Sequence, residues 1–160
     1  LRAPLAAQMP HVSALIVIGA GTPGDEVAAF AARAGKPVLR ARLEPDAAQA
    51  RALKGREVVA FAGIGRPDKF FSTLREIGAR VVAAHGYGDH HPYRREDILG
   101  LQAEAEARGA LLVTTEKDMA RIDASALAPQ AGPPVALPVR LRFSDEQALA
   151  SLLAAALAAR

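Results

Sequence analysis

Short apolar runs alternate along the chain with segments in which apolar residues recur at helical spacing. The runs are bounded by glycine, proline or charged residues and predict strands over residues 12–18, 37–43, 57–61, 80–84, 110–114 and 135–141. Helical spacing predicts helices over residues 25–34, 67–77 and 94–108 and from Ser144 onward, and residues 45–54 are either helical or irregular. This alternation predicts an α/β fold, a Rossmann-like three-layer α/β/α sandwich with a mostly parallel sheet.

Some of these segments carry more detailed expectations. The uninterrupted apolar run at residues 12–18 predicts a strand that is buried on both faces, whereas the alternating arginines at residues 37–43 indicate an edge strand. In the last predicted helix, Ser144 and Gln147 have the spacing of a capping box. That helix also has an apolar stripe, formed by Leu149, Leu152, Leu153 and Leu157.

The composition narrows the class of protein without identifying a function. A length of 160 residues and a hydrophobic fraction of 51% suit one ordinary domain with a sizeable core. The formal charge of +3 comes from scattered bases, without the runs of like charge that nucleic-acid binding favours. Arginine suits phosphate or carboxylate recognition, although solvated helix faces are the commoner explanation of scattered bases.

Cysteine usage and apolar segments limit the chemistry and the location. There is no cysteine, so disulfides and thiolate chemistry are excluded, which agrees with a reducing compartment. The apolar segments 12–18 and 148–159 are too short to span a bilayer, and no signal peptide is apparent. Because the chain begins with Leu1, we expect it to be part of a longer protein.

The turn after the first predicted strand matches a dinucleotide-binding pattern. Residues 19–24 have the spacing G-x-G-x-x-G between a strand and a helix, and Glu44 lies near the position where such sites carry an acid. Pro23, however, removes one of the amides that would bind a pyrophosphate. A nucleotide-binding oxidoreductase domain is therefore one alternative, and a tight turn that needs glycine is the simpler one.

The loop after the third predicted strand has features of an anion-binding turn. Gly63 and Gly65 would allow positive φ and a close approach of the backbone to a ligand. Pro67 suits the first position of a helix, and Arg66 places a cation beside the free amides of that helix. We therefore expect Gly63, Gly65 and Arg66 to face a substrate or a phosphate, unless the turn serves only to deliver Phe70 into the core.

The segment "TTEKD", residues 114–118, follows the fifth predicted strand. Thr115 and Asp118 have the [ST]-x-x-[DE] spacing of a helix cap, and a cap accounts for both residues. Glu116 and Lys117 are then expected to form an exposed pair. We favour a structural role for this segment.

The loop after the fourth predicted strand, "GYGDHHPY" at residues 86–93, holds two of the four histidines and both tyrosines of the chain. A histidine beside an aspartate that sets its tautomer can handle protons or orient a base. Adjacent histidines rarely converge on one ion, and no further ligand cluster accompanies them, so we expect no metal site. The alternative is that Asp89 caps a turn while both imidazoles lie in solvent.

These three loops all follow predicted parallel strands. Because the carboxyl ends of parallel strands meet at one edge of a sheet, ligands of open α/β sheets bind at that edge. We therefore expect residues 63–68, 89–93 and 115–118 to lie together.

Three ordered motifs resemble the tetraacyldisaccharide 4'-kinase (lipid A 4'-kinase) family of lipid A biosynthesis. They are "EVVAFAGIGRPDKFFSTLREIGA", "RVVAAHGYGDHHPY" and "LLVTTEKDMARI". The opening "LRAPLAAQMPHVSALIVIG" also resembles the segment that follows the family's nucleotide-binding half. The resemblance covers residues 1–160 and implies that they form the C-terminal α/β domain of a two-domain kinase.

The resemblance also implies a reaction and its participants. Members of the family transfer the γ-phosphate of ATP to the 4'-hydroxyl of a tetraacyldisaccharide 1-phosphate at the cytoplasmic face of the bacterial inner membrane. Their first domain supplies a P-loop, the magnesium ligands and a catalytic aspartate, so ATP and Mg would be bound mainly outside this chain. The implied partners are that N-terminal domain, the lipid A precursor and the membrane surface, without nucleic acid.

The family's second domain contributes the histidine of an Asp-His motif, which matches Asp89 and His90 here. The resemblance therefore implies that His90 pairs with the catalytic aspartate of the first domain, with Asp89 beside it. Two departures bear on this reading. The chain has no G-x-x-x-x-G-K-[ST], so we expect it to be inactive alone, and Gly88 replaces the family's usual proline and should loosen the loop. A non-enzymatic α/β binding module is the remaining alternative.

Overall fold

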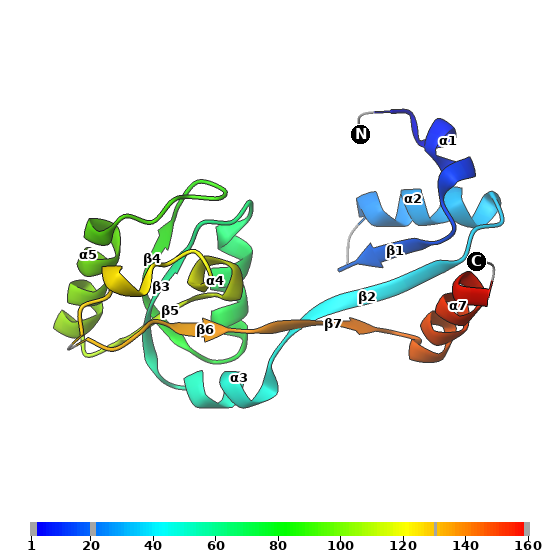
Figure 1. Cartoon of the computed structure of the whole chain (residues 1–160). Helices are drawn as coiled ribbons and strands as arrows, with labels where there is room; N and C mark the ends of the chain where they lie inside the picture. The colour runs from blue at the N-terminus through cyan, green and yellow to red at the C-terminus, as the bar shows by residue number, and fades with distance from the viewer. Residues whose placement is uncertain (1–2, 20–21, 130, 159–160) are drawn as a thin grey trace. The chain divides into compact units, whose positions relative to one another are not determined.

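The computed structural model describes residues 3–19, 22–129 and 131–158 (Figure 1). It has an α/β fold whose determined strand pairings are parallel, which confirms the predicted class. The strands are divided between two sheets, however, and the chain forms two compact units. Unit 1 comprises the residues up to Glu44 and those from Arg140 onward, and unit 2 is Pro45–Val139.

Unit 2 is built on a four-stranded sheet. Its strands are β3 (Glu57–Ala62), β4 (Arg80–Gly86), β5 (Leu111–Thr115) and β6 (Val135–Leu137). Their order is β4-β3-β5-β6, and every neighbouring pair is parallel. The carboxyl ends of these strands therefore lie at one edge of the sheet.

Helices cover both faces of this sheet (Figure 1). On one face, α4 (Pro67–Glu76) packs Phe70, Phe71 and Leu74 against alternate residues of β3, together with α3 (Ala47–Leu53). On the other face, the core residues of α5 (Arg95–Ala107) are Ile98, Leu101 and Ala105. Because side chains alternate across a strand, one set of β3 residues faces each layer, and β3 is buried on both sides.

Unit 1 contains a three-stranded sheet with the order β1-β2-β7. Its strands are β1 (Leu15–Ile18), β2 (Val38–Pro45) and β7 (Val139–Phe143). Its helices are α1 (Leu5–Gln8), η1 (Met9–His11), α2 (Thr22–Arg33) and α7 (Glu146–Ala158). Because β2 is the central strand, the prediction of an edge strand at residues 37–43 is wrong.

The prediction that the first strand is buried on both faces is also wrong. Val17 is buried, and it packs against α2, where a Cβ on Gly24 would lie 2.9 Å from its Cγ1. Ile16 and Ile18 point to the opposite face of the strand and are exposed. Within the described residues the helix therefore covers only one side of β1.

Two predictions near the end of the chain differ from the structure. The single strand expected at residues 135–141 is two strands, β6 and β7, separated at Pro138, which has no N–H to donate to a ladder. The expected cap is also shifted by one residue, because Asp145 Oδ1 accepts the backbone N–H of Ala148 at 2.8 Å and the helix begins at Glu146. The apolar stripe of α7 is not a core, since Leu153 and Leu157 are exposed.

In the described parts of the chain, none of the helices is long and apolar enough to cross a membrane.

Candidate active site

The three loops expected at one edge of the sheet do meet there. The backbone N–H of His90, in the loop after β4, donates to the carbonyl of Gly63, after β3, at 3.1 Å. The N–H of Gly63 in turn donates to Oδ1 of Asp118, after β5, at 3.1 Å. The prediction of a shared edge is confirmed, and Gly63 is the residue that links the other two loops.

Asp118 is the centre of this edge and is fully buried. Its Oδ1 accepts from Gly63 N–H, from the Tyr93 hydroxyl at 3.0 Å and from the Arg121 guanidinium, while its Oδ2 accepts from Thr115 Oγ1 at 2.6 Å. Thr115 also accepts the N–H of Asp118 at 3.1 Å and caps the short helix α6 (Glu116–Met119), so the predicted cap is confirmed. The Asp118 side chain also has a role beyond this cap, because it accepts hydrogen bonds from residues of all three loops.

Arg121 is a residue that the sequence reasoning missed. Its Nη2 donates to the carbonyl of Gly63 at 2.8 Å as well as to Asp118, and its Nε donates to the carbonyl of Lys117 at 3.2 Å. Its Nη1 is buried and has no hydrogen-bond partner among the described residues. Asp118 and Arg121 are three residues apart, a spacing that brings side chains together on a helix. This spacing is the feature of the sequence from which the ion pair could have been predicted.

Aromatic rings fill the space behind these hydrogen bonds. Tyr93 lies edge-on to Phe61 and to Tyr87, with ring centroids 5.4 and 5.3 Å away. Burial, and then the negative charge of Asp118, raise the pKa of Tyr93 well above its usual value. Its hydroxyl therefore stays protonated at neutral pH and remains a donor to Asp118.

The two adjacent histidines occupy different surroundings. His90 has a φ of 59°, in the left-handed region, and its side chain is 86% exposed, with Nε2 3.9 Å from Asp89 Oδ2. His91 is 30% exposed, its Nε2 lies 3.2 Å from Asp97 Oδ2, and its ring packs on that of Tyr87 with centroids 4.6 Å apart. A hydrogen bond from the backbone N–H of Arg94 and, less strongly, the hydrogen bond with the His91 ring lower the pKa of Asp97.

A cavity of about 500 Å³ lies at this edge of the sheet. Side chains and backbone from all three loops form its lining, which consists of Ile64, Gly65, Asp89, His90, Lys117, Ala120 and Arg121. The sequence-predicted Asp89, His90 and Gly65 are thus brought together. Lys117, expected to be only half of an exposed pair, also lines the cavity.

Two other predicted residues have different positions. Gly63 is buried behind the cavity, and an added Cβ would lie 2.9 Å from the Tyr93 hydroxyl and 3.2 Å from Asp118 Oδ1. Neither Gly63 nor Gly65 has a positive φ, so the expectation that these glycines adopt one is wrong. At residue 63 it is close packing that requires glycine. Arg66 is exposed before α4 and is not among the residues that line the cavity, whereas Phe70 is buried in the core as the alternative reading predicted.

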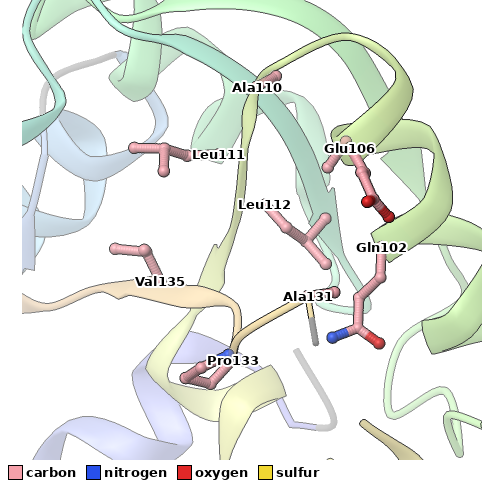
Figure 2. A pocket seen from close by; sticks show the side chains of 9 residues that line it. Gln102, Glu106, Ala110, Leu111, Leu112, Ala131, Pro133 and Val135 are labelled. Atoms are coloured by element: carbon pink, nitrogen blue, oxygen red, sulfur yellow. The ribbon is translucent and has the colours of Figure 1, made fainter. Parts of the chain in front are cut away.

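A second cavity, of about 220 Å³, lies at the opposite end of β5, beside the end of α5 (Figure 2). Its polar side chains are Gln102 and Glu106. Both polar atoms of the Gln102 side chain already have partners within the chain. Its Nε2 donates to the carbonyl of Gly132 and its Oε1 accepts from the N–H of Ala128, each at 2.9 Å. This cavity therefore belongs to the packing of the segment before β6.

The glycine turn at residues 19–24 lies only partly within the described residues, because Ala20 and Gly21 are outside them. Gly19 has a φ of 87°, and Gly24 packs closely on Val17. Glu44 is paired with Arg42 at 2.6 Å and with a second arginine at 3.5 Å. These contacts support the interpretation as a tight turn. Within residues 3–19, 22–129 and 131–158, no three His, Asp or Glu side chains gather as metal ligands.

Comparison with known proteins identifies the family. Residues 1–158 match the family model of LpxK, tetraacyldisaccharide-1-P 4'-kinase. The chain belongs to the tetraacyldisaccharide 4'-kinase family. Tetraacyldisaccharide 4'-kinases from Methylobacterium nodulans and Methylorubrum extorquens are 53% and 54% identical to it, over 99% and 98% of the chain. A relative of the same name from Bradyrhizobium is 48% identical.

The chain spans 45% to 46% of the length of these 4'-kinase relatives. A crystal structure described as the "apo" form of LpxK from Aquifex aeolicus in complex with ATP matches 96% of the chain and 45% of its own, with a TM-score of 0.57 and 22% identity. At that identity the structural match supports the fold. The sequence matches carry the family membership, which the motifs around residues 63, 90 and 118 had predicted.

Proposed function

We propose that this chain is the C-terminal part of a kinase that transfers the γ-phosphate of ATP to the 4'-hydroxyl of a tetraacyldisaccharide 1-phosphate. The family membership supports the reaction, since the relatives are named for it. The observation that carries the proposal for this chain is the position of His90, exposed at a cavity at the carboxyl edge of the sheet, where α/β proteins bind ligands.

In this proposal His90 acts on a base supplied by the rest of the protein. The attacking hydroxyl must lose its proton as it bonds to phosphorus, so an aspartate base needs a fixed orientation and a suitable pKa. The His90 ring can approach such a base because its side chain is 86% exposed at the cavity. The backbone N–H of His90 donates to the carbonyl of Gly63, and this hydrogen bond fixes the position of the backbone that carries the exposed ring.

ATP and magnesium belong to the remainder of the kinase in this proposal. The chain contains no G-x-x-x-x-G-K-[ST], and three acidic or histidine ligands do not cluster in its described parts. Lys117 and Arg121, which line the cavity, could bind a phosphate, but they do not belong to a P-loop sequence. When bound with ATP, magnesium neutralises charge on the phosphates, and this chain's contribution is the placement of His90 and Asp89.

The partners and the location follow from the same reaction. We propose that the chain acts with its own N-terminal P-loop domain on a lipid A precursor at the cytoplasmic face of the inner membrane. The scattered bases give no support for a nucleic-acid partner.

The test is an assay of the full-length protein and of this chain alone with ATP, Mg²⁺ and the disaccharide 1-phosphate. We expect the full-length protein to form a second phosphate monoester, located at the 4'-position by ³¹P and proton NMR, and the chain alone to form none. Absence of turnover by the full-length protein would favour a binding module. Tight binding of NADH by the chain in calorimetry would instead favour the oxidoreductase alternative.

A further inference from the structure

The cavity beside His90 has hydrogen-bond donors that the protein itself does not use. Arg121, which lines it, donates through Nη2 and Nε to backbone carbonyls and to Asp118, and its buried Nη1 has no hydrogen-bond partner in the part of the chain that the structure describes. Buried donors are satisfied in the great majority of cases, and one without a partner calls for an acceptor that is missing from the chain.

Lys117 provides a second cation at the same place. It lines the cavity, and its side chain takes part in none of the ion pairs formed among the described residues. The carboxylate that pairs with Arg121, Asp118, is fully buried and already accepts from four donors. Lys117 and Arg121 together therefore present positive charge to the cavity, whose lining also includes the carboxylate of Asp89.

The lining also contains a carboxylate. Asp89, beside His90, would repel an anion but can accept a hydrogen bond from a hydroxyl. A ligand that carries both a phosphate and a hydroxyl matches both kinds of group. Phosphate suits the cations because its oxygens accept charge-assisted hydrogen bonds from guanidinium and ammonium groups.

We propose that Lys117 and Arg121 form a phosphate-binding subsite that holds a phosphate group of a substrate next to His90. This inference rests on the proposed function, in which both substrates carry phosphate. The phosphate comes either from the nucleotide or from the 1-position of the acceptor disaccharide, and kinetics on the full-length enzyme distinguish these two sources.

The kinetic experiment compares Lys117→Met with wild type. The substitution keeps an unbranched side chain and removes the charge. A control is Lys54→Met, since Lys54 is an exposed lysine just before the amino end of β3, at the opposite edge of the sheet. Arg121→Lys is a second variant, which keeps the charge but removes the planar fork of donors.

We expect the KM for one substrate to rise about tenfold in Lys117→Met, the loss typical of one charge-assisted hydrogen bond, while Lys54→Met matches wild type. A rise in the KM for ATP assigns the nucleotide phosphate. A rise for the 1-phosphorylated acceptor, but not for the same acceptor without its 1-phosphate, assigns the acceptor phosphate. If no KM moves more than twofold, the subsite is wrong.

A chemical readout separates this inference from the proposed function, because it needs no turnover. The full-length protein is acetylated with an amine-reactive ester with and without inorganic phosphate at matched ionic strength, and the labelling rates of Lys117 and Lys54 are measured by peptide mass spectrometry. We expect phosphate to slow labelling of Lys117 at least twofold relative to Lys54. Equal rates would overturn the subsite, and protection without any KM effect would show an adventitious anion site and overturn its assignment to a substrate.

Discussion

His90 and His91 are neighbours in the chain, yet the structure uses them in opposite ways. His91 is packed on Tyr87 and hydrogen-bonded to Asp97, so its ring is part of the structure of the loop. His90 makes its hydrogen bond through the backbone, to Gly63, and leaves its ring exposed at the cavity. The left-handed φ of His90 turns the chain between the two rings and separates them.

The comparison shows that the exposed ring of His90 is positioned through hydrogen bonds of the backbone, and not through contacts of the ring itself. The carbonyl that anchors His90 belongs to Gly63, and Gly63 is held by Asp118 and Arg121. Stability at this edge should therefore depend on the buried network and on His91, whereas catalysis should depend on His90. Four substitutions test this division.

The largest effect should come from Asp118→Asn. The amide removes the negative charge that pairs with Arg121 and replaces one of the two acceptor oxygens, which together serve Gly63, Tyr93, Arg121 and Thr115, by a donor. Breaking a buried ion pair from one side costs about 3–5 kcal/mol, so we expect a loss of about that size in the free energy of unfolding, measured by urea denaturation of the chain.

Asp123→Asn is the matched control for Asp118→Asn. Asp123 is an exposed aspartate that caps the short helix η2 (Ala124–Ala126), and its replacement should change stability little. If both variants unfold at the same urea concentration, the buried network does not support this edge.

The next effect should come from His90→Ala in the full-length kinase. We expect kcat to fall about 100-fold or more, the usual cost of a lost acid–base element, with a small change in the KM for ATP. The unfolding midpoint should stay near that of wild type, because the ring is exposed. A well-folded variant with near wild-type turnover would remove His90 from the chemistry.

His91→Ala should show the reverse pattern. Loss of the packing on Tyr87 and of the hydrogen bond to Asp97 should cost about 1.5 kcal/mol of stability, measured by urea denaturation. In the full-length enzyme kcat should fall less than tenfold. A fall in kcat as large as that of His90→Ala would mean that both rings serve the reaction.

The smallest of the predicted changes in the free energy of unfolding is that of His90→Gly. Glycine adopts the left-handed φ of this position without strain, so we expect a gain of roughly 0.5 kcal/mol in stability together with the same loss of kcat as in His90→Ala. A loss of stability would show that the His90 ring contributes contacts to the fold.

Local patterns predicted much of unit 2. The strand at residues 57–61 and the helix at residues 67–77 lie within a residue or so of β3 and α4, because an apolar run bounded by charges and a proline start are local signals. The Thr115 cap was likewise predictable, since a cap depends on residues three apart. From parallel strands alone it also followed that residues 63, 90 and 118 would share an edge.

The errors have a common physical origin in contacts between distant residues. The apolar run before Gly19 predicts a strand buried on both sides, but burial depends on whether a second layer covers the strand, and α2 covers only the Val17 side. Arginines at residues 37–43 suggested an edge, yet β2 is central in its sheet. Strand order is a property of pairing that no local pattern encodes.

The sequence by itself determined the α/β class, the family and the loop in which His90 lies, because spacing and motif order are written along the chain. Only the tertiary structure decided that Asp118 is fully buried and that Arg121 holds Gly63. It also decided that Lys117 and Arg121 share a cavity with His90, although about 30 residues of sequence separate them from it. The physical reason is that hydrogen bonding and burial depend on distances in space, which the folding of β3, β4 and β5 into one parallel sheet sets.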